Sequence, residues 1–454
     1  MSRRNNIHLK MQRGWLFFAI WLFSGVICSQ NPIIQNQFTA DPTARFFGDK
    51  VYLYPSHDIL APEGKKLRKD WFCMEDYHVF SSSNLTDWTD HGVIVSQKSV
   101  PWAKPDAYSM WAPDCVLRNG KYYFYFPTAP DSIYGRGFSI GVAVADNPTG
   151  PFVPELTPIK NVRGIDPNVF IDKDGQAYLY WSQGDVFGAK LKENMTELDS
   201  EPVIFQNLPD KGLKEGPFLF ERNGIYYLTF PHVENKIERL EYAIGDNPLG
   251  PFKMTGVIMD ESSTGCWTNH HSIINFKNQW FLFYHNNDLS PGFDKNRSVR
   301  IDSLFFNANG TIQKVMPSLR GVGLTNASDK IQIDRYSRMS NKGIAIVFND
   351  TLNAFGGWKT LFSTKDGWIQ YNTVDFGKKK FKNIIVKVAS KTGGNLQLRL
   401  NDAKGAVVAK VNIPQGENWQ TIKVPVTGLK YGIQNLIFSS GTDNPVEVDW
   451  ISFE

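Results

Sequence analysis

Residues 111–126 read WAPDCVLRNGKYYFYF and contain the unit that decides the fold: an acidic residue or a histidine, a short turn and an aromatic strand. The same order recurs five times along the chain, and the leading residues are Asp41, Asp114, Asp166, Glu215 and His270. After a longer first interval the leaders lie about 50 residues apart, which is the repeat length of a β-propeller with four-stranded blades. We therefore predict an all-β fold that begins with a five-bladed β-propeller and brings the leaders together near one axis.

A second repeat supports this period. Residues 146–152 read DNPTGPF and residues 246–252 read DNPLGPF. Proline and glycine at fixed positions specify a tight turn, so the same turn is expected twice, two blades apart. Three further pairs ahead of aromatic strands predict type I′ hairpin turns, at Asn119-Gly120, Asp174-Gly175 and Asn223-Gly224.

The last part of the chain follows a different all-β pattern. Short strands alternate apolar and polar residues, for example over 384–388 and 396–400. Regular strands of this kind predict a β-sandwich, here of the jelly-roll type. The domains predicted are therefore a propeller over residues 31–328 and a sandwich over residues 330–454.

The N-terminus has the pattern of an export signal. Four basic residues precede an apolar run from Trp15 to Cys28, which ends at Ser29 and Gln30. This order predicts a secretory signal peptide over residues 1–29 and an exported protein, periplasmic or secreted. Lipid anchoring at Cys28 is the less favoured alternative, because the residues before it match a lipobox poorly. The net charge of +4 gives nucleic acid little to bind.

The acidic leaders point to sugar chemistry. Inverting glycoside hydrolysis needs a carboxylate that activates water and a carboxylic acid that protonates the leaving oxygen, about 6.5–9.5 Å apart. Several carboxyl groups in one partly dry pocket repel one another, so at least one is expected to stay protonated near neutral pH. This chemistry requires no cofactor. The expected partner is a plant-type polysaccharide or oligosaccharide, with no nucleic acid or protein partner.

Residues 31–325 resemble glycoside hydrolase family 43. The motifs that carry the resemblance are Thr39-Ala40-Asp41-Pro42, Trp111-Ala112-Pro113-Asp114, Gly164 to Phe170, Lys214 to Phe218 and Thr268 to Ser272. The resemblance implies that Asp41 is the general base and Glu215 the general acid. It also implies that Asp166 orients the acid and adjusts its pKa.

The resemblance extends to binding positions. It implies substrate-binding roles for Trp111, Asp114, Arg297 and His270, although the carboxylate at the position of Asp114 is usually structural or shapes the pocket. It also implies a histidine on the propeller axis, either His270 or His271, where family members hold water or a metal ion. A Ca²⁺ ion on the axis would then be structural or electrostatic, although no EF-hand-like loop is present.

The activity implied by the resemblance is inverting, exo-acting release of terminal α-L-arabinofuranose or β-D-xylose. The insertion over 61–77 is expected to wall off one end of the pocket, and Trp102, Tyr108 and Trp111 are expected to line it. Three alternatives stay open: an exo-β-1,3-galactosidase of the same family, a noncatalytic glycan-binding propeller, and a mannoside phosphorylase or transferase. The last would need clustered basic phosphate ligands, and the noncatalytic protein would be expected to lack one of the three catalytic acids.

Residues 330–454 resemble a family 6 carbohydrate-binding module. The segments that carry this resemblance are Asp366 to Tyr371, Gly394 to Leu400 and Val448 to Phe453. The loop over 439–445 lacks the aromatic residue that often binds sugar in that family. Trp368 is the candidate platform, and a purely structural appendage is an equal alternative.

Overall fold

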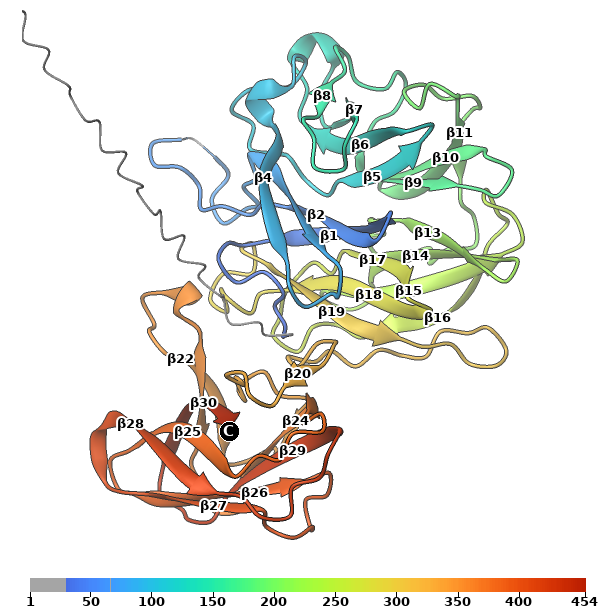
Figure 1. Ribbon diagram of the computed structural model, residues 1–454. Coiled ribbons are helices and arrows are strands. Elements are labelled where there is room, and N and C mark those ends of the chain that lie inside the picture. The colour runs from blue at the N-terminus through green and yellow to red at the C-terminus, as the bar shows by residue number, and fades with distance from the viewer. Residues whose placement is uncertain (1–29, 66) are drawn as a thin grey trace, which may run out of the picture.

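The computed structural model describes residues 30–65 and 67–454 (Figure 1). The predicted signal peptide, residues 1–29, lies outside the described residues. Over the described part, the chain is built from strands and three short 3-10 helices, η1 (Gln97–Ser99), η2 (Ser132–Tyr134) and η3 (Ala354–Gly356). None of the helices described reaches the length and hydropathy that a membrane crossing requires.

Five antiparallel sheets come first, and the strands within each sheet pair in chain order. The first sheet consists of β1 (Ala40–Phe47), β2 (Lys50–Ser56), β3 (Asp76–Ser82) and β4 (Thr89–Ser96). The second consists of β5 (Asp114–Arg118), β6 (Lys121–Thr128), β7 (Ser139–Ala145) and β8 (Val153–Pro154). The third consists of β9 (Ile165–Ile171), β10 (Ala177–Gln183), β11 (Asp185–Leu191) and β12 (Val203–Ile204). The fourth consists of β13 (Phe218–Arg222), β14 (Ile225–Val233), β15 (Glu238–Gly245) and β16 (Lys253–Met259). The fifth is β17 (His271–Phe276), β18 (Gln279–Asn286), β19 (Ser298–Leu304).

The first strands of these sheets form a closed ring. They contact one another in the order β1, β5, β9, β13, β17 and back to β1, as expected for a β-propeller (Figure 1). The N-terminal segment closes the ring beside β19, where the amide of Ile33 donates to the carbonyl of Val299 (2.9 Å) and that of Thr39 to Arg297 (2.9 Å). Residues at the start of the inner strands therefore meet at one end of the ring.

The two copies of the DNPxGPF turn adopt the same conformation and make the same contact. In each copy the glycine has a positive φ and its amide donates to the carbonyl of the asparagine three residues before it. The carbonyl of Pro148 accepts a hydrogen bond from the Tyr54 hydroxyl (2.6 Å), and that of Pro248 accepts one from Tyr180 (2.8 Å). The predicted repeat of one turn is confirmed, and it ties each turn to the preceding sheet.

The hairpin turns agree with the prediction in two of three cases. Asn119-Gly120 and Asn223-Gly224 have positive φ at both residues, as a type I′ turn requires. The prediction is wrong for Asp174-Gly175, where only the glycine has a positive φ (86°). Here the Asp174 carboxylate accepts a hydrogen bond from the amide of Gln176 (2.9 Å), and the strands resume pairing only at Ile171 and Ala177.

The C-terminal domain is a sandwich of two sheets. One sheet has the order β20 (Thr325–Asn326), β24 (Trp368–Asp375), β29 (Ile433–Ser440), β26 (Gly394–Leu400), β27 (Ala409–Ile413), with β21 (Arg338–Met339) also paired to β24. The other has the order β22 (Ile344–Phe348), β23 (Trp358–Phe362), β30 (Val446–Phe453), β25 (Asn383–Ser390), β28 (Gly416–Pro425). The prediction of an all-β protein with a propeller followed by a β-sandwich is confirmed.

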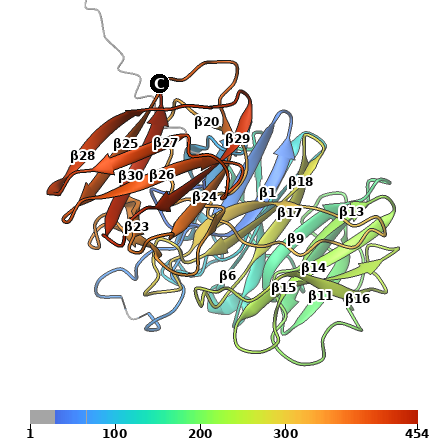
Figure 2. The ribbon, with the colours of Figure 1, turned by 90° about the horizontal axis from the view of Figure 1, so that it is seen from below.

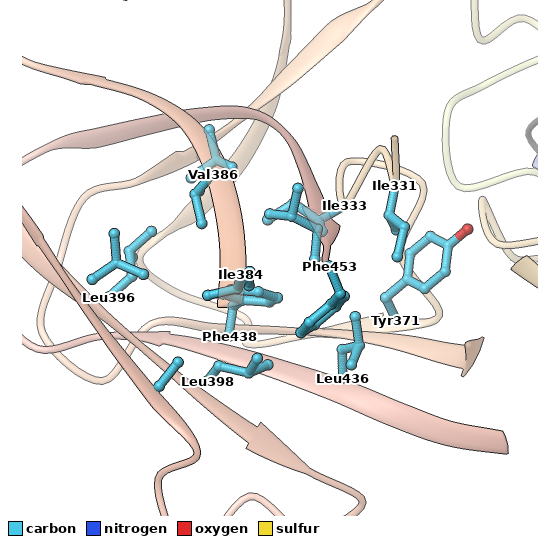
Figure 3. Close-up of a cluster of buried hydrophobic side chains, with 14 of the residues drawn as sticks. Ile331, Ile333, Tyr371, Ile384, Val386, Leu396, Leu398, Leu436, Phe438 and Phe453 are labelled. Atoms are coloured by element: carbon cyan, nitrogen blue, oxygen red, sulfur yellow. The ribbon is translucent and has the colours of Figure 1, made fainter. Parts of the chain in front are cut away.

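Alternating apolar side chains build the sandwich core. Ile384 and Val386 on β25 face Leu396 and Leu398 on β26 across the two sheets, with Phe438 on β29 beside them (Figure 3). All five are almost fully buried, and burying a side chain of this size contributes about 1.5–3 kcal/mol. The strand period of two therefore accounts for this domain.

The sandwich lies on one side of the propeller, next to the sheet of β17–β19 (Figures 1 and 2). The contact uses the start of the described chain. The Gln30 side chain donates to the Tyr371 hydroxyl (2.8 Å), and the Arg335 guanidinium donates to the carbonyl of Asn31 (2.7 Å). Residues that help to close the propeller thus also bind the sandwich.

Candidate active site

A pocket of about 200 Å³ lies where the inner strands begin. Four of the five predicted leaders line it, namely Asp41, Asp166, Glu215 and His270. The second sheet contributes Trp111, just before β5. The structure therefore brings the predicted catalytic residues together.

Aromatic side chains form the walls of this pocket. Trp71 and Phe72 come from the insertion over 61–77, which walls the pocket as predicted, and Trp111 and Trp267 line it as well. The Trp111 ring is supported by Phe138, with 4.5 Å between the ring centroids. Such rings offer flat apolar faces to the C–H groups of a sugar.

The expectation that Trp102 and Tyr108 line the pocket is wrong. Trp102 has no exposed surface and stacks on Phe126 with 6.1 Å between centroids, inside the core of the first two sheets. Tyr108 is also buried and lies outside the pocket lining. Position in a long loop therefore did not distinguish these core residues from Trp111.

Asp41 is held as a carboxylate at the start of β1. Its backbone has φ of 45°, a conformation that non-glycine residues adopt rarely and often at functional sites. Its carboxylate accepts hydrogen bonds from Arg297 (2.6 and 3.1 Å) and from the Ser56 hydroxyl (2.7 Å). Burial raises the pKa of Asp41, but the Arg297 charge and the Ser56 hydrogen bond outweigh burial and lower the pKa to about 2. The group is therefore ionised at neutral pH.

Arg297 binds two carboxylates at once. It lines the pocket, is almost fully buried, and donates to Asp41 and, from Nε and Nη2, to Asp58 (both 2.9 Å). Asp58 is a site residue that was not predicted from the sequence. A signal was present, because Ser56 and Asp58 follow the first aromatic strand at the end where the leaders meet, and both side chains bind site residues.

Asp166 fixes the segment that carries Glu215. Like Asp41 it has a positive φ (58°), and its Oδ2 accepts the amide of Gly216 (2.9 Å), the residue after Glu215. Burial, followed by the charges of Glu215 and Asp41, raises the pKa of Asp166 well above its ordinary value. The predicted role of orienting the acid matches this hydrogen bond.

Glu215 has the environment of a proton donor. Its side chain is half-buried in the pocket lining. Burial, then the charge and hydrogen bond of Glu238, then the charge of Asp41, raise the pKa of Glu215 well above its ordinary value. Two carboxyl groups of one pocket, Asp41 and Glu215, are thus driven to opposite protonation states, which is how acid and base roles are separated in glycosidases.

Glu238 is a functional residue that the sequence analysis missed. It starts β15, is almost fully buried, and shares a side-chain hydrogen bond with Glu215. Its Oε2 accepts the amide of Asn269 (2.7 Å), which holds it in place. Burial raises the pKa of Glu238 to about 7, so the pKa values of both neighbouring carboxyl groups lie above their ordinary range. No motif surrounds Glu238, and only the folded backbone brings it to the acid.

Substituting Glu238 by Gln should move the alkaline limb of the kcat profile to lower pH. Glu215 works protonated, so activity falls as pH rises through its pKa, and Glu238 raises that pKa. A neutral amide removes this effect, and the limb should shift by about one pH unit or more. The control Glu221→Gln alters a carboxylate paired with Lys173 and should leave the limb in place. An unchanged limb in Glu238→Gln would contradict the coupling.

The two adjacent histidines have different surroundings. His270 lines the pocket, with its Nδ1 4.0 Å from the Asp166 carboxylate, and burial lowers its pKa to about 4. His271 has no exposed surface, and its Nε2 is 2.6 Å from the Thr229 hydroxyl. Of the two histidines expected near the axis, His270 is the one that faces the pocket, whereas the His271 side chain packs outside it, against the expectation that His271 could bind a metal ion there.

Asp114 does not line the pocket, which favours its expected structural role over a substrate-binding one. Its carboxylate is fully buried and accepts hydrogen bonds from Arg45 (2.9 and 2.5 Å), the amide of Val169 (2.6 Å) and the Asn168 side chain (3.0 Å). Arg45 also lies over the Phe218 ring, 5.1 Å from its centroid. This pair links three inner strands and is structural.

A calcium ion held by protein oxygens alone does not fit the axis, so the expected axial ion would be held by His270 and water. Ca²⁺ takes 6–8 oxygen ligands. The carboxylates of Asp41 and Asp114 are each bound by an arginine, and His270 offers a nitrogen. We therefore derive no step of the chemistry through calcium.

Two family models match the chain. The model described as glycosyl hydrolases family 43 matches residues 29–312, and the model of carbohydrate binding module family 6 matches residues 339–454. Xylosidase/arabinosidase 43A of Humicola insolens is 35% identical over 63% of this chain and 99% of its own length. Arabinoxylan arabinofuranohydrolase of Bacillus subtilis is 29% identical over 94% of this chain and 93% of its own.

Solved structures agree with these matches. One is a GH43 β-xylosidase/α-arabinofuranosidase from a compost microbial metagenome, in complex with xylotriose and in a calcium-free form. It is 35% identical, with a TM-score of 0.56 over 63% of this chain and 97% of that one. The arabinoxylan arabinofuranohydrolase of Bacillus subtilis, in complex with cellotetraose, has a TM-score of 0.55 and 26% identity over 95% of this chain and 99% of that one.

Proposed function

Because this chain belongs to glycosyl hydrolase family 43, we propose that it releases terminal β-D-xylose or α-L-arabinofuranose from plant polysaccharides or oligosaccharides, with inversion. The observation that carries the proposal is the pair of opposed carboxyls in one pocket: Asp41 with its pKa lowered and Glu215 with its pKa raised. The names of the similar relatives, xylosidase/arabinosidase and arabinoxylan arabinofuranohydrolase, support these two sugars.

In the proposed mechanism Asp41 accepts a proton from a water molecule that attacks the anomeric carbon. Glu215 donates its proton to the departing glycosidic oxygen in the same step. Asp166 holds the Glu215 segment through the Gly216 amide, and Glu238 keeps the acid protonated. Arg297 keeps Asp41 ionised and fixes its orientation through two hydrogen bonds. No cofactor takes part.

Exo action follows from the size of the pocket. A volume of about 200 Å³ is below the usual range of about 300–1,000 Å³ for small-molecule sites. The insertion residues Trp71 and Phe72 wall it. This shape suits one terminal sugar ring, with the rest of the chain outside.

The test is turnover of 4-nitrophenyl β-D-xyloside, α-L-arabinofuranoside and β-D-galactoside by the purified chain. We expect activity on one or both of the first two, and proton NMR should show that the first anomer formed is inverted. Activity on the galactoside alone would favour the galactosidase alternative. Glycan binding with no turnover on any substrate, including xylo-oligosaccharides, would overturn the proposal.

We also propose that the sandwich binds glycan on one sheet face. Trp358, Trp419 and Trp450 lie on β23, β28 and β30 and line a cavity of about 520 Å³. Trp419 is 38% exposed, so part of its ring is open to solvent. Trp368, the platform considered from the sequence, lies on β24 of the other sheet and is half-buried.

Trp419→Ala should weaken retention of the protein on insoluble xylan about tenfold or more, because an aromatic stacking contact contributes about 1–3 kcal/mol by analogy with base stacking. Turnover of soluble 4-nitrophenyl substrates should stay unchanged, since Trp419 lies outside the catalytic pocket. Trp368→Ala is the matched control on the opposite sheet. Equal loss in both variants, or none in either, would contradict this assignment of the face.

We propose that residues 1–29 direct export, so that the enzyme works in the periplasm or outside the cell. The basic residues and the apolar run from Trp15 to Cys28 support this. N-terminal sequencing of the protein recovered from its native host should find a mature chain that starts near Gln30. A mature chain that retains Met1 would contradict export by this signal.

A further inference from the structure

We propose that His57, Asp76 and His78 form a binding site for a divalent transition-metal ion of the Zn²⁺ class, separate from the catalytic pocket. One donor atom from each of the three side chains lies within 4.8 Å of the others. None of the three lines the catalytic pocket. The inference is independent of the hydrolytic reaction, because it concerns the first sheet alone.

The strand register places these residues together. β2 and β3 pair in antiparallel register, with Val51 opposite Ser82 and Leu53 opposite Phe80. Continued by four residues, this register puts His57 opposite Asp76. Asp76 and His78 lie two residues apart on β3 and therefore project from the same side. Tyr77 between them has no exposed surface and projects into the core.

The three donor atoms lie within reach of one ion, and His57 and Asp76 are hydrogen-bonded directly to each other without it. The Nδ1 of His57 is 2.7 Å from Oδ1 of Asp76, and the rings of His57 and His78 are 4.9 Å apart between centroids. Zinc ligands at about 2.0–2.1 Å stand about 3.3 Å from one another in a tetrahedron. Small side-chain adjustments therefore bring three donors to one ion, and water completes the coordination.

A fourth residue prepares His78 as a ligand. Its Nδ1 is 3.1 Å from the Asp90 carboxylate on β4. A carboxylate on one ring nitrogen orients a ligating histidine and leaves the other nitrogen for the metal. Two imidazoles and one carboxylate favour Zn²⁺ and similar ions over Ca²⁺, which prefers oxygen alone. The side chains of the three ligands are 15–19% exposed, so an ion can reach them from solvent.

The site adjoins, along the chain, two residues that contact the catalytic site. His57 stands between Ser56, which donates to Asp41, and Asp58, which binds Arg297. A metal ion bound by His57 would join this segment to β3. Occupancy should therefore stabilise the propeller as well as bind the ion.

The test uses the full chain, stripped with EDTA, dialysed and titrated with Zn²⁺ alone. Isothermal titration should give a micromolar or tighter site, and Zn²⁺ should raise the thermal midpoint. His78→Gln and Asp76→Asn should each lose this site or weaken it at least tenfold. His91→Gln is the control, because His91 lies on the same sheet but contacts Ser81 instead of the cluster.

The outcomes decide the proposal. Two variants are used so that misfolding of one leaves the other informative, with circular dichroism as the check on folding. Zinc binding that is retained by the folded His78→Gln or Asp76→Asn chain with wild-type affinity would overturn the assignment. Failure of the wild-type chain to bind Zn²⁺ below about 100 μM would overturn it as well. Loss in both variants with retention in His91→Gln supports it.

Discussion

Glu215→Gln lowers kcat on xylobiose or an arabinoxylan oligosaccharide by about 10²–10⁴-fold, because general acid catalysis contributes about this much. An amide keeps the shape of the side chain but has no proton to donate to the leaving oxygen. The loss should be much smaller for 4-nitrophenyl glycosides of the same sugar, since 4-nitrophenolate leaves without protonation. The measurement is kcat for both leaving groups in the wild type and the variant.

The contrast between leaving groups identifies the acid. Glu201→Gln alters an exposed carboxylate outside the pocket and is the control for loss of a negative charge. An equal loss of activity on both kinds of substrate in Glu215→Gln would point to disturbed binding or folding. No loss on the natural leaving group would show that another residue donates the proton.

Arg297→Met lowers the free energy of unfolding by about 3–5 kcal/mol at neutral pH, because removing one partner of a buried ion pair leaves the other charge without a counter-charge. Arg297 is almost fully buried and is bound to both Asp41 and Asp58. Without it the carboxylates are left without their counter-charge, and Asp41 protonates more readily. The variant should therefore also lose most of its hydrolytic activity. Urea denaturation followed by fluorescence measures the first effect.

The loss of unfolding free energy in Arg297→Met should become smaller as pH falls. In the wild type the pKa of Asp41 is about 2, below the value of about 3.9 expected for the unfolded chain. The stabilisation is thus complete above about pH 4 and is lost as pH falls through about 2. The gap between wild type and Arg297→Met should be widest near pH 7 and narrow below pH 4. Arg136→Met, at an exposed arginine, should show little change. A constant gap across this range would contradict the ion-pair account.

Much of the fold was predictable because it repeats. The aromatic strands and the two DNPxGPF turns carry the same signal several times, and each copy confirms the others. The leaders Asp41, Asp166 and Glu215 were predictable for the same reason, since equivalent positions in a ring of sheets meet at its axis. Their order in the chain also matched the family motifs. The repeat and the motifs together were sufficient to predict that these three residues lie in one pocket.

The positions of the remaining site residues depend on contacts that the sequence repeat does not predict. Glu238 reaches Glu215 from the start of β15, and Asp58 of the first sheet reaches Arg297 of the neighbouring fifth sheet. Asp114 occupies a leader position but does not line the pocket, because Arg45 from the neighbouring inner strand binds its carboxylate. A position in the repeat therefore predicts where a residue lies, whereas its partners decide whether it faces the pocket.

The closure of the ring by the N-terminal segment has a consequence for synthesis. The side chain of Asn31 donates to the carbonyl of Ile301, 270 positions later in the chain (3.0 Å). A contact of such long range forms late, because the cost of closing the intervening loop precedes any gain. A ribosome must therefore release nearly the whole propeller before its first and last segments can meet. Until then the growing chain exposes unpaired strand edges, so chaperones that shield such edges should raise the yield of folded enzyme.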